Sequence, residues 1–178
     1  MRNWLGWCAL PLVMAAAPSS AAGTGGLLIV HASIVDGTGA AARPGAVRVV
    51  DGIIRCVGTC RAARGDRRID AAGLVLAPGF IDTHSHHDRG LAEQRDAAPV
   101  TAQGVTTIVV GQDGFSDLPL SGQFAQFEAK PSAVNIASYV GHGSVREAVM
   151  GADSKRPARP DEMERMNALV AEAMDAGA

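Results

Sequence analysis

The stretch Pro78-Gly79-Phe80-Ile81-Asp82-Thr83-His84-Ser85-His86-His87-Asp88 contains three of the five histidines in the chain. It overlaps a nearly continuous apolar run at residues 74–82, which predicts a strand buried on both faces of a parallel sheet. Side chains two residues apart in a strand point to the same face, so His84 and His86 would project together. Two imidazoles on rigid backbone at this separation can bind one metal ion. Hydrogen bonds inside a polar loop are the alternative, but the position at the end of an apolar strand favours the metal.

Polar residues also follow two later apolar segments, residues 105–110 and residues 134–140. The carboxyl ends of parallel strands meet at one edge of a sheet, where (β/α) barrels place their active sites. Asp113 could therefore bind the same metal, bridge two ions, or tie down its own loop. Four further residues are expected either to hydrogen-bond the ligands or to line a substrate cleft: Asp82, Asp88, Gln112 and His142. For His142, a bond to a neighbouring loop is the alternative.

Helical periodicity alternates with these strands, which predicts an α/β fold with a parallel sheet. Helices are expected at residues 91–103, 121–130 and 160–176, and a short helix at residues 145–150 that Ser144 could cap. In the last long helix, an apolar stripe that includes Met163, Met166 and Met174 predicts core packing.

The region at residues 23–75 has short β-rich segments separated by glycine turns, which predicts a small β domain. Strands are expected at residues 27–30, 33–35, 46–50 and 53–57. Asp51-Gly52 is typical of a tight hairpin. The arginine-rich residues 61–68 are interpreted as a solvated loop. Cys56 and Cys60 could form a disulfide or be two small apolar residues beside a turn.

Residues 1–22 have the pattern of a secretory signal peptide, with Arg2 before an apolar run and small residues after it. The run is shorter than the roughly 20 residues of a transmembrane helix. We therefore expect an exported protein, periplasmic or secreted, without a stable membrane anchor; an uncleaved anchor is the alternative.

The composition excludes two broad classes. The 178 residues are 47% hydrophobic and 19% charged, unlike an intrinsically disordered chain. The formal net charge is −2, which gives no global basic field for nucleic acid.

Several of these segments together resemble the amidohydrolase superfamily. The run Ile69-Asp70-Ala71-Ala72-Gly73, followed by residues 77–86 with the His-x-His motif, is similar to the start of the first barrel strand in that superfamily. Residues 104–111 and 135–146 most resemble the N-acyl-D-amino-acid deacylases (D-aminoacylases). The resemblance extends over residues 27–178.

This resemblance implies a small β-sandwich-like domain at residues 23–75, followed by a metal-dependent (β/α)8 TIM-type barrel from residue 76. Such a barrel takes about 250 residues, whereas residues 76–178 suffice for three βα units. The sequence therefore predicts an incomplete barrel that stops where a fourth strand should begin.

The activity that the resemblance implies is hydrolysis of an amide, most directly of a small-molecule N-acyl-D-amino acid, by a metal-activated water. His84 and His86 match the family's first-strand ligands, while Asp113 stands where characterised D-aminoacylases carry a metal-binding cysteine. A divalent metal is expected, with Zn the first choice and one or two ions. The family's general base is an aspartate on the last barrel strand, which would lie beyond Ala178. The alternatives are a cyclic-amide hydrolase, a dipeptidase, or an inactive fragment that only binds metal.

Overall fold

The computed structural model describes residues 25–178, so the predicted signal segment lies outside the described residues. The chain divides into two compact units, the first ending at Ala77 and the second comprising Pro78–Ala178. Within residues 25–178, no helix is both long enough and apolar enough to cross a membrane.

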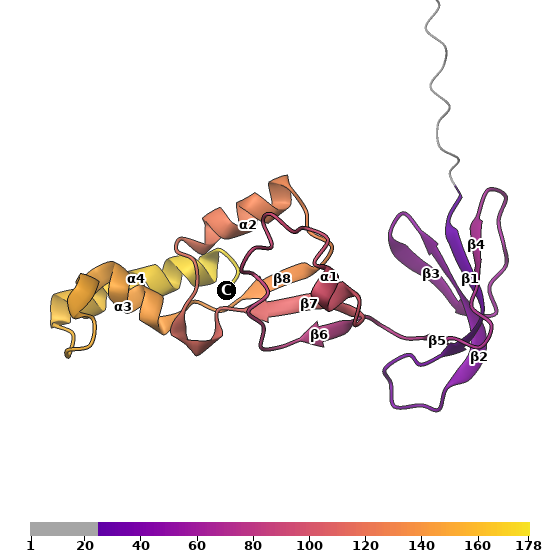
Figure 1. The fold of residues 1–178 in the computed structure, drawn as a ribbon, viewed down its shortest axis with the longest axis horizontal. Helices are drawn as coiled ribbons and strands as arrows, with labels where there is room; N and C mark the ends of the chain where they lie inside the picture. Colours follow the sequence, from indigo (N-terminus) through magenta and orange to yellow (C-terminus); the bar gives the residue numbers. More distant parts are fainter. Residues whose placement is uncertain (1–24) are drawn as a thin grey trace, which may run out of the picture. The chain divides into compact units, whose positions relative to one another are not determined.

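The first unit is a five-stranded sheet in the order β3-β2-β1-β4, with β5 also paired to β1 (Figure 1). Strands β1, β2 and β3 are antiparallel neighbours, whereas β4 and β5 both run parallel to β1. The strands are β1 (Leu27–Ile34), β2 (Arg43–Val50), β3 (Ile53–Gly58), β4 (Arg67–Asp70) and β5 (Val75–Leu76).

Two predictions for this unit need correction. The expected strands at residues 27–30 and 33–35 form one strand, β1, whose register shifts around His31, a residue with a left-handed φ of 61°. The basic segment was expected to be a loop, but its end belongs to β4, where Ile69 pairs with Ile29 of β1. The Asp51-Gly52 hairpin between β2 and β3 is confirmed.

A buried carboxylate links separate segments of the first unit. Asp66, with a side chain only 3% exposed, accepts two hydrogen bonds from Arg48 and one each from the backbone N–H groups of Gly26 and Ala63. These donors hold the pKa of Asp66 well below its ordinary value, with the Arg48 hydrogen bond the largest cause. Cys56 and Cys60 form a disulfide at the end of β3.

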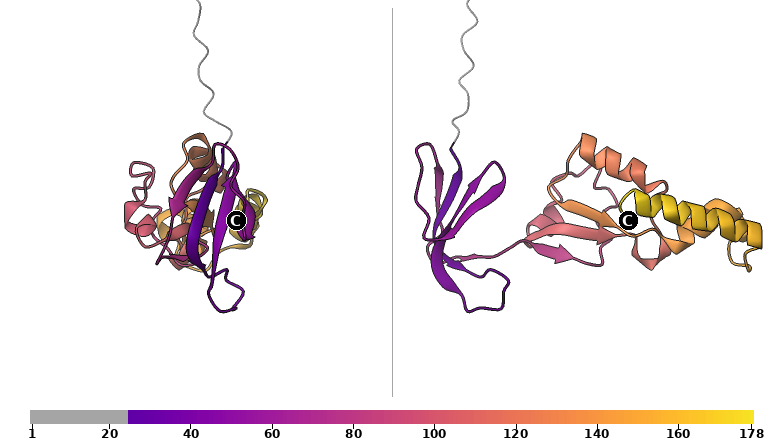
Figure 2. Two further views of the ribbon diagram at one scale, coloured as in Figure 1. Left: turned by 90° about the vertical axis from the view of Figure 1, so that its right-hand side faces the viewer. Right: turned by 180° about the vertical axis from the view of Figure 1, so that it is seen from behind.

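The second unit is built on a parallel three-stranded sheet, β6-β7-β8, and α2 lies over one face of it at β8 (Figures 1 and 2). The strands are β6 (Phe80–Asp82), β7 (Val105–Val110) and β8 (Asn135–Ser138). The α-helices are α1 (Ala98–Thr101), α2 (Leu120–Ala129), α3 (His142–Met150) and α4 (Pro160–Asp175), and the 3-10 turns are η1 (Gln112–Gly114) and η2 (Gly151–Asp153).

The core of this unit forms around the central strand β7. Ile108 and Val110 of β7 are 0% and 1% exposed, and they pack with Leu91, Val100 and Val134. The core thus joins β7 to α1, to the segment before α1 and to the residue that precedes β8.

The predicted continuous strand at residues 74–82 is wrong. Its two halves are β5 and β6, which belong to different sheets. Pro78 lies between them and has no N–H to donate to a strand ladder. The expected burial is also wrong, because β6 is an edge strand in which Phe80 and Ile81 are each 62% exposed.

Three helix predictions also change. The first helix is only α1, since Pro99 is accepted in the first turn of a helix but not inside one. α3 begins at His142, so Ser144 lies in its first turn and is not the cap. α4 confirms the last helix, but core packing is wrong for Met163 and Met174, which are 44% and 57% exposed. Only Met166 of the three is buried.

Candidate metal centre

His84 and His86 lie in the loop that directly follows β6, at the carboxyl end of the parallel sheet. Their imidazole rings are 5.7 Å apart between centroids and meet edge to face at 62°. Ser85 between them is 2% exposed, and its backbone N–H donates to the carbonyl of Val109 in β7. The buried Ser85 therefore fixes the loop on the sheet while both imidazoles face outward.

Asp113 reaches the same place from the next strand. β7 ends at Val110, Gly111 turns the chain with φ 82°, and Asp113 follows in η1 with a left-handed φ of 60°. Its Oδ2 lies 3.0 Å from Nε2 of His86 and 3.4 Å from Nε2 of His84. The structure thus brings together the three residues that the sequence suggested as metal ligands.

The three side chains form an accessible polar cluster. Their side chains are 58%, 48% and 63% exposed for His84, His86 and Asp113. Hydrogen bonds from His84 and then His86 hold the pKa of the Asp113 carboxyl below its ordinary value. An ionised carboxylate therefore lies beside the two imidazoles.

This donor set fits a divalent metal ion. One ligand atom from each residue lies within 4.8 Å of the others, which places them around a common point. Two imidazole nitrogens and a carboxylate oxygen are a ligand set that zinc accepts, and three protein ligands leave a position open for water or substrate.

Two of the other predicted site residues contact this cluster's loops. The Asp82 carboxylate accepts the backbone N–H of His84 at 3.3 Å. Gln112 donates from Nε2 to the carbonyl of Thr83 at 2.8 Å, so it links the two loops that carry the cluster. The Oε1 atom of Gln112 is buried and has no protein partner within residues 25–178.

A pocket of about 510 Å³ opens beside the cluster. Its lining includes His86, Asp88, Arg89, Gln112, Asp113 and Ser116. The pocket therefore includes the predicted residue Asp88. His142 begins α3 and is not among the three clustered side chains of the described part of the chain.

Ser116 was not predicted as a site residue, and Ser144 was expected only to cap a helix. The two serines exchange hydrogen bonds across 28 residues, joining the loop after β7 to the first turn of α3. No local spacing signals such a contact, because it depends on how the two loops pack.

Three comparisons place the chain among known proteins. Residues 67–178 match the Amidohydrolase family model. D-aminoacylase of Alcaligenes xylosoxydans xylosoxydans is 37% identical to this chain. The match covers 85% of this chain and 36% of the relative. N-acyl-D-aspartate deacylase of the same organism is 39% identical, covering 85% and 35%.

Solved structures give the same picture. One is the structure of a D-aminoacylase with a binuclear metal center, which matches with a TM-score of 0.78 and 38% identity. The match covers 85% of this chain and 37% of that chain. An N-acyl-D-glutamate deacylase from Bordetella bronchiseptica, complexed with zinc and a phosphonate inhibitor, has a TM-score of 0.78 and 31% identity, covering 84% and 36%. The chain thus has a mixed α/β fold like theirs and spans a little over a third of their length.

Proposed function

The chain belongs to the amidohydrolase family, and from this premise we propose that it supplies the metal-binding part of an N-acyl-D-amino-acid deacylase. The observation that carries the proposal is the cluster of His84, His86 and Asp113 at the carboxyl ends of two adjacent parallel strands. The relatives named above as deacylases of N-acyl-D-amino acids support the substrate class.

His84, His86 and Asp113 would hold a divalent ion, for which zinc is our first choice. When bound, such an ion polarises a substrate carbonyl and lowers the pKa of water toward 7. The chain's own residues would orient this chemistry: Asp82 and Gln112 hold the two ligand loops, and the pocket beside His86 accepts part of the amide.

We propose that the parallel sheet continues into a (β/α)8 barrel. The N–H of Tyr139 donates to the carbonyl of Val110, so by alternation Ile136 and Ser138 present their backbone groups at the outer edge of β8. β6 is the other edge. Two open edges of a parallel sheet support further pairing, since parallel sheets are normally covered on both faces and continued at their sides.

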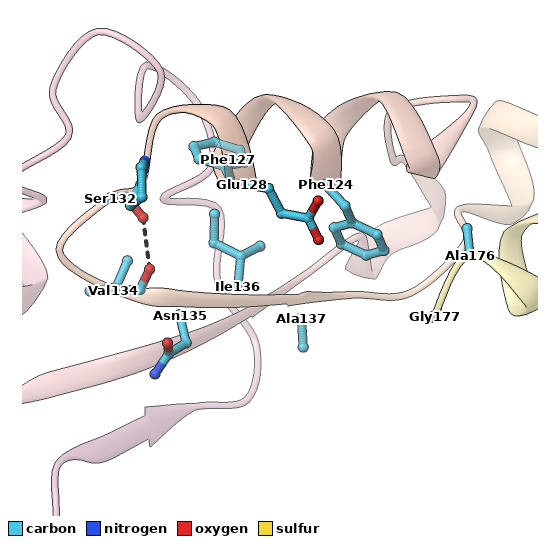
Figure 3. A pocket seen from close by; sticks show the side chains of 11 residues that line it. Phe124, Phe127, Glu128, Ser132, Val134, Asn135, Ile136, Ala137, Ala176 and Gly177 are labelled. Carbon is cyan, nitrogen blue, oxygen red and sulfur yellow. Dashed lines mark hydrogen bonds between the residues drawn. The ribbon is translucent and has the colours of Figure 1, made fainter. Parts of the chain in front are cut away.

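A pocket beside β8 supports the same proposal. It encloses about 490 Å³ between α2 and β8, and Gly177, just after α4, also lines it. In Figure 3, Phe124 of α2 extends toward β8 and Ile136 of β8 extends toward α2, with the Glu128 carboxylate beside Phe124. A further strand along β8 would cover the apolar part of this lining. The general base would come from such a later strand.

We also propose that the protein is exported and divided into a signal segment at residues 1–22, a β domain at residues 23–75 and the start of the barrel at residue 76. The apolar N-terminal pattern supports export. The Cys56–Cys60 disulfide is compatible with an oxidising compartment. N-terminal sequencing of the mature protein tests the cleavage, which we expect after Ala22.

The deacylase proposal is tested with N-acetyl-D-amino acids, their L enantiomers, hydantoins and dipeptides. The substrates are given to zinc-loaded protein that carries all eight proposed barrel units. We expect release of acetate from D substrates, and its loss in the His84→Ala/His86→Ala variant. Cleavage of only hydantoins or dipeptides would replace the deacylase proposal with that activity. Metal binding without any turnover would leave a metal-binding protein and refute the enzyme.

A further inference from the structure

We propose that Ser116 and Ser144 are positioning residues that hold the Asp113 loop in its metal-binding conformation. This inference rests on the proposed metal site, because it concerns how one ligand of that site is kept in place.

The loop that carries Asp113 has an unfavourable backbone conformation. Gly111, Asp113 and Gly114 all have left-handed φ angles, of 82°, 60° and 88°. For Asp113, which has a Cβ, this conformation costs about 1 kcal/mol and persists only where the surrounding structure imposes it. The ligand geometry therefore needs contacts from outside the loop.

The two serines provide these contacts on one side of the loop. Oγ of Ser144 accepts the backbone N–H of Ser116 at 3.0 Å and donates to the carbonyl of Ser116 at 2.8 Å. Oγ of Ser116 accepts the backbone N–H of Gly141 at 2.8 Å. All three bonds are partly buried, and they join the end of the Asp113 loop to the start of α3.

Two glycines let α3 approach the loop closely enough for these bonds. A Cβ on Gly141 would lie 2.7 Å from the carbonyl oxygen of Gly114, and one on Gly143 would lie 2.8 Å from the same atom. The first turn of α3 therefore packs directly against the residue that follows Asp113. On the other side, Gln112 ties the loop to Thr83. Asp113 is thus held between two anchors: Gln112 connects its loop to the segment after β6, and the serine pair connects it to the first turn of α3.

The test measures the affinity of the full 178-residue chain for Co²⁺ and Zn²⁺. Ser144→Ala removes both bonds to Ser116, and we expect about 10-fold weaker binding, as for other groups that orient metal ligands. The Co²⁺ absorption spectrum should change with it, because one ligand is no longer held in geometry. Ser144→Thr, which keeps the hydroxyl, should restore both the affinity and the spectrum.

Ser132→Ala is the matched control. Its hydroxyl also donates to a backbone carbonyl in a partly buried place, that of Val134 at 2.7 Å, but it lies away from the Asp113 loop. Metal affinity should not change in this variant. In an Asp113→Ala background, Ser144→Ala should have no further effect, whereas a general loss of stability would weaken binding in both backgrounds.

The outcomes separate this inference from the proposed function. Wild-type chain that binds no metal refutes the metal site, and the positioning role with it. Wild-type chain that binds metal, with Ser144→Ala binding equally tightly, refutes only the positioning role. Should Ser144→Ala not fold, as judged by circular dichroism, Ser116→Ala tests the other half of the pair, since it removes the bond from Gly141 and keeps both bonds of Ser144. Weaker metal binding would support the positioning role, and unchanged affinity and spectrum would overturn it for Ser116.

Discussion

Replacing Gly111 by alanine tests how tightly the turn after β7 is packed. A Cβ at this position would lie 2.3 Å from the carbonyl oxygen of Tyr139 and 3.0 Å from its nitrogen. Both are backbone atoms, so relief of the clash has to disturb the bond from Tyr139 N–H to Val110, which is 2.9 Å long. Alanine at φ 82° costs about 1–2 kcal/mol, and the lost hydrogen bond about 0.5–1.5 kcal/mol. We expect Gly111→Ala to lower the free energy of unfolding by about 1.5–3.5 kcal/mol.

Two other glycines of the same unit serve as controls in urea unfolding followed by circular dichroism. Gly90 has a similar φ of 78° with nothing near its Cβ position, so Gly90→Ala should cost only the conformational part, about 1–2 kcal/mol. Gly122 lies inside α2 in open space, and Gly122→Ala should stabilise by about 0.5–1 kcal/mol. Equal destabilisation by Gly111→Ala and Gly90→Ala would show that the clash is absent.

Three further predictions concern the second unit. Ile108 is 0% exposed, so Ile108→Ala should lower the free energy of unfolding by about 2–5 kcal/mol and Ile108→Val by about 0.5–1.5 kcal/mol. Equal losses for the two variants in urea unfolding would contradict the close packing of Ile108. Hydrogen bonds, chiefly from Arg156, lower the pKa of Glu162 from 4.5 to about 2, so the stability that they add is complete above pH 4.5 and lost as the pH falls toward 2. An acid titration of Glu162→Gln should lack this loss of stability, and a profile identical to that of the wild-type chain would contradict the contribution of Glu162. Asp113→Cys should raise the affinity for Zn²⁺ relative to Mn²⁺, because thiolate is the softer ligand, and a competition titration without such a shift would count against direct ligation.

The sequence predicted the elements whose signals are local. β7 follows from an apolar run, and α4 follows from an apolar stripe with Pro160 in the first helical turn; both match within a residue. The split between β5 and β6 was missed because an apolar run does not reveal which sheet each half joins. β4 was missed for a similar reason: its arginines are polar, and it forms a strand because it pairs with β1.

The candidate site was partly visible in the sequence. The spacing of His84 and His86 and the place of Asp113 after the next strand were enough to group the three. The left-handed backbone of Asp113 and the Ser116–Ser144 exchange were not, because they arise from packing between loops that are far apart in sequence. Ser144 does not cap the helix predicted from residue 145, because α3 begins at His142.

The central claim is that His84, His86 and Asp113 bind a divalent metal ion. The most direct measurement is a calorimetric titration of Zn²⁺ into the metal-free 178-residue chain and into its His84→Ala/His86→Ala variant. We predict saturable binding of at least one ion by the wild-type chain and loss of that binding in the variant, with both proteins folded by circular dichroism. Equal metal binding by the two proteins would show that His84 and His86 are not metal ligands.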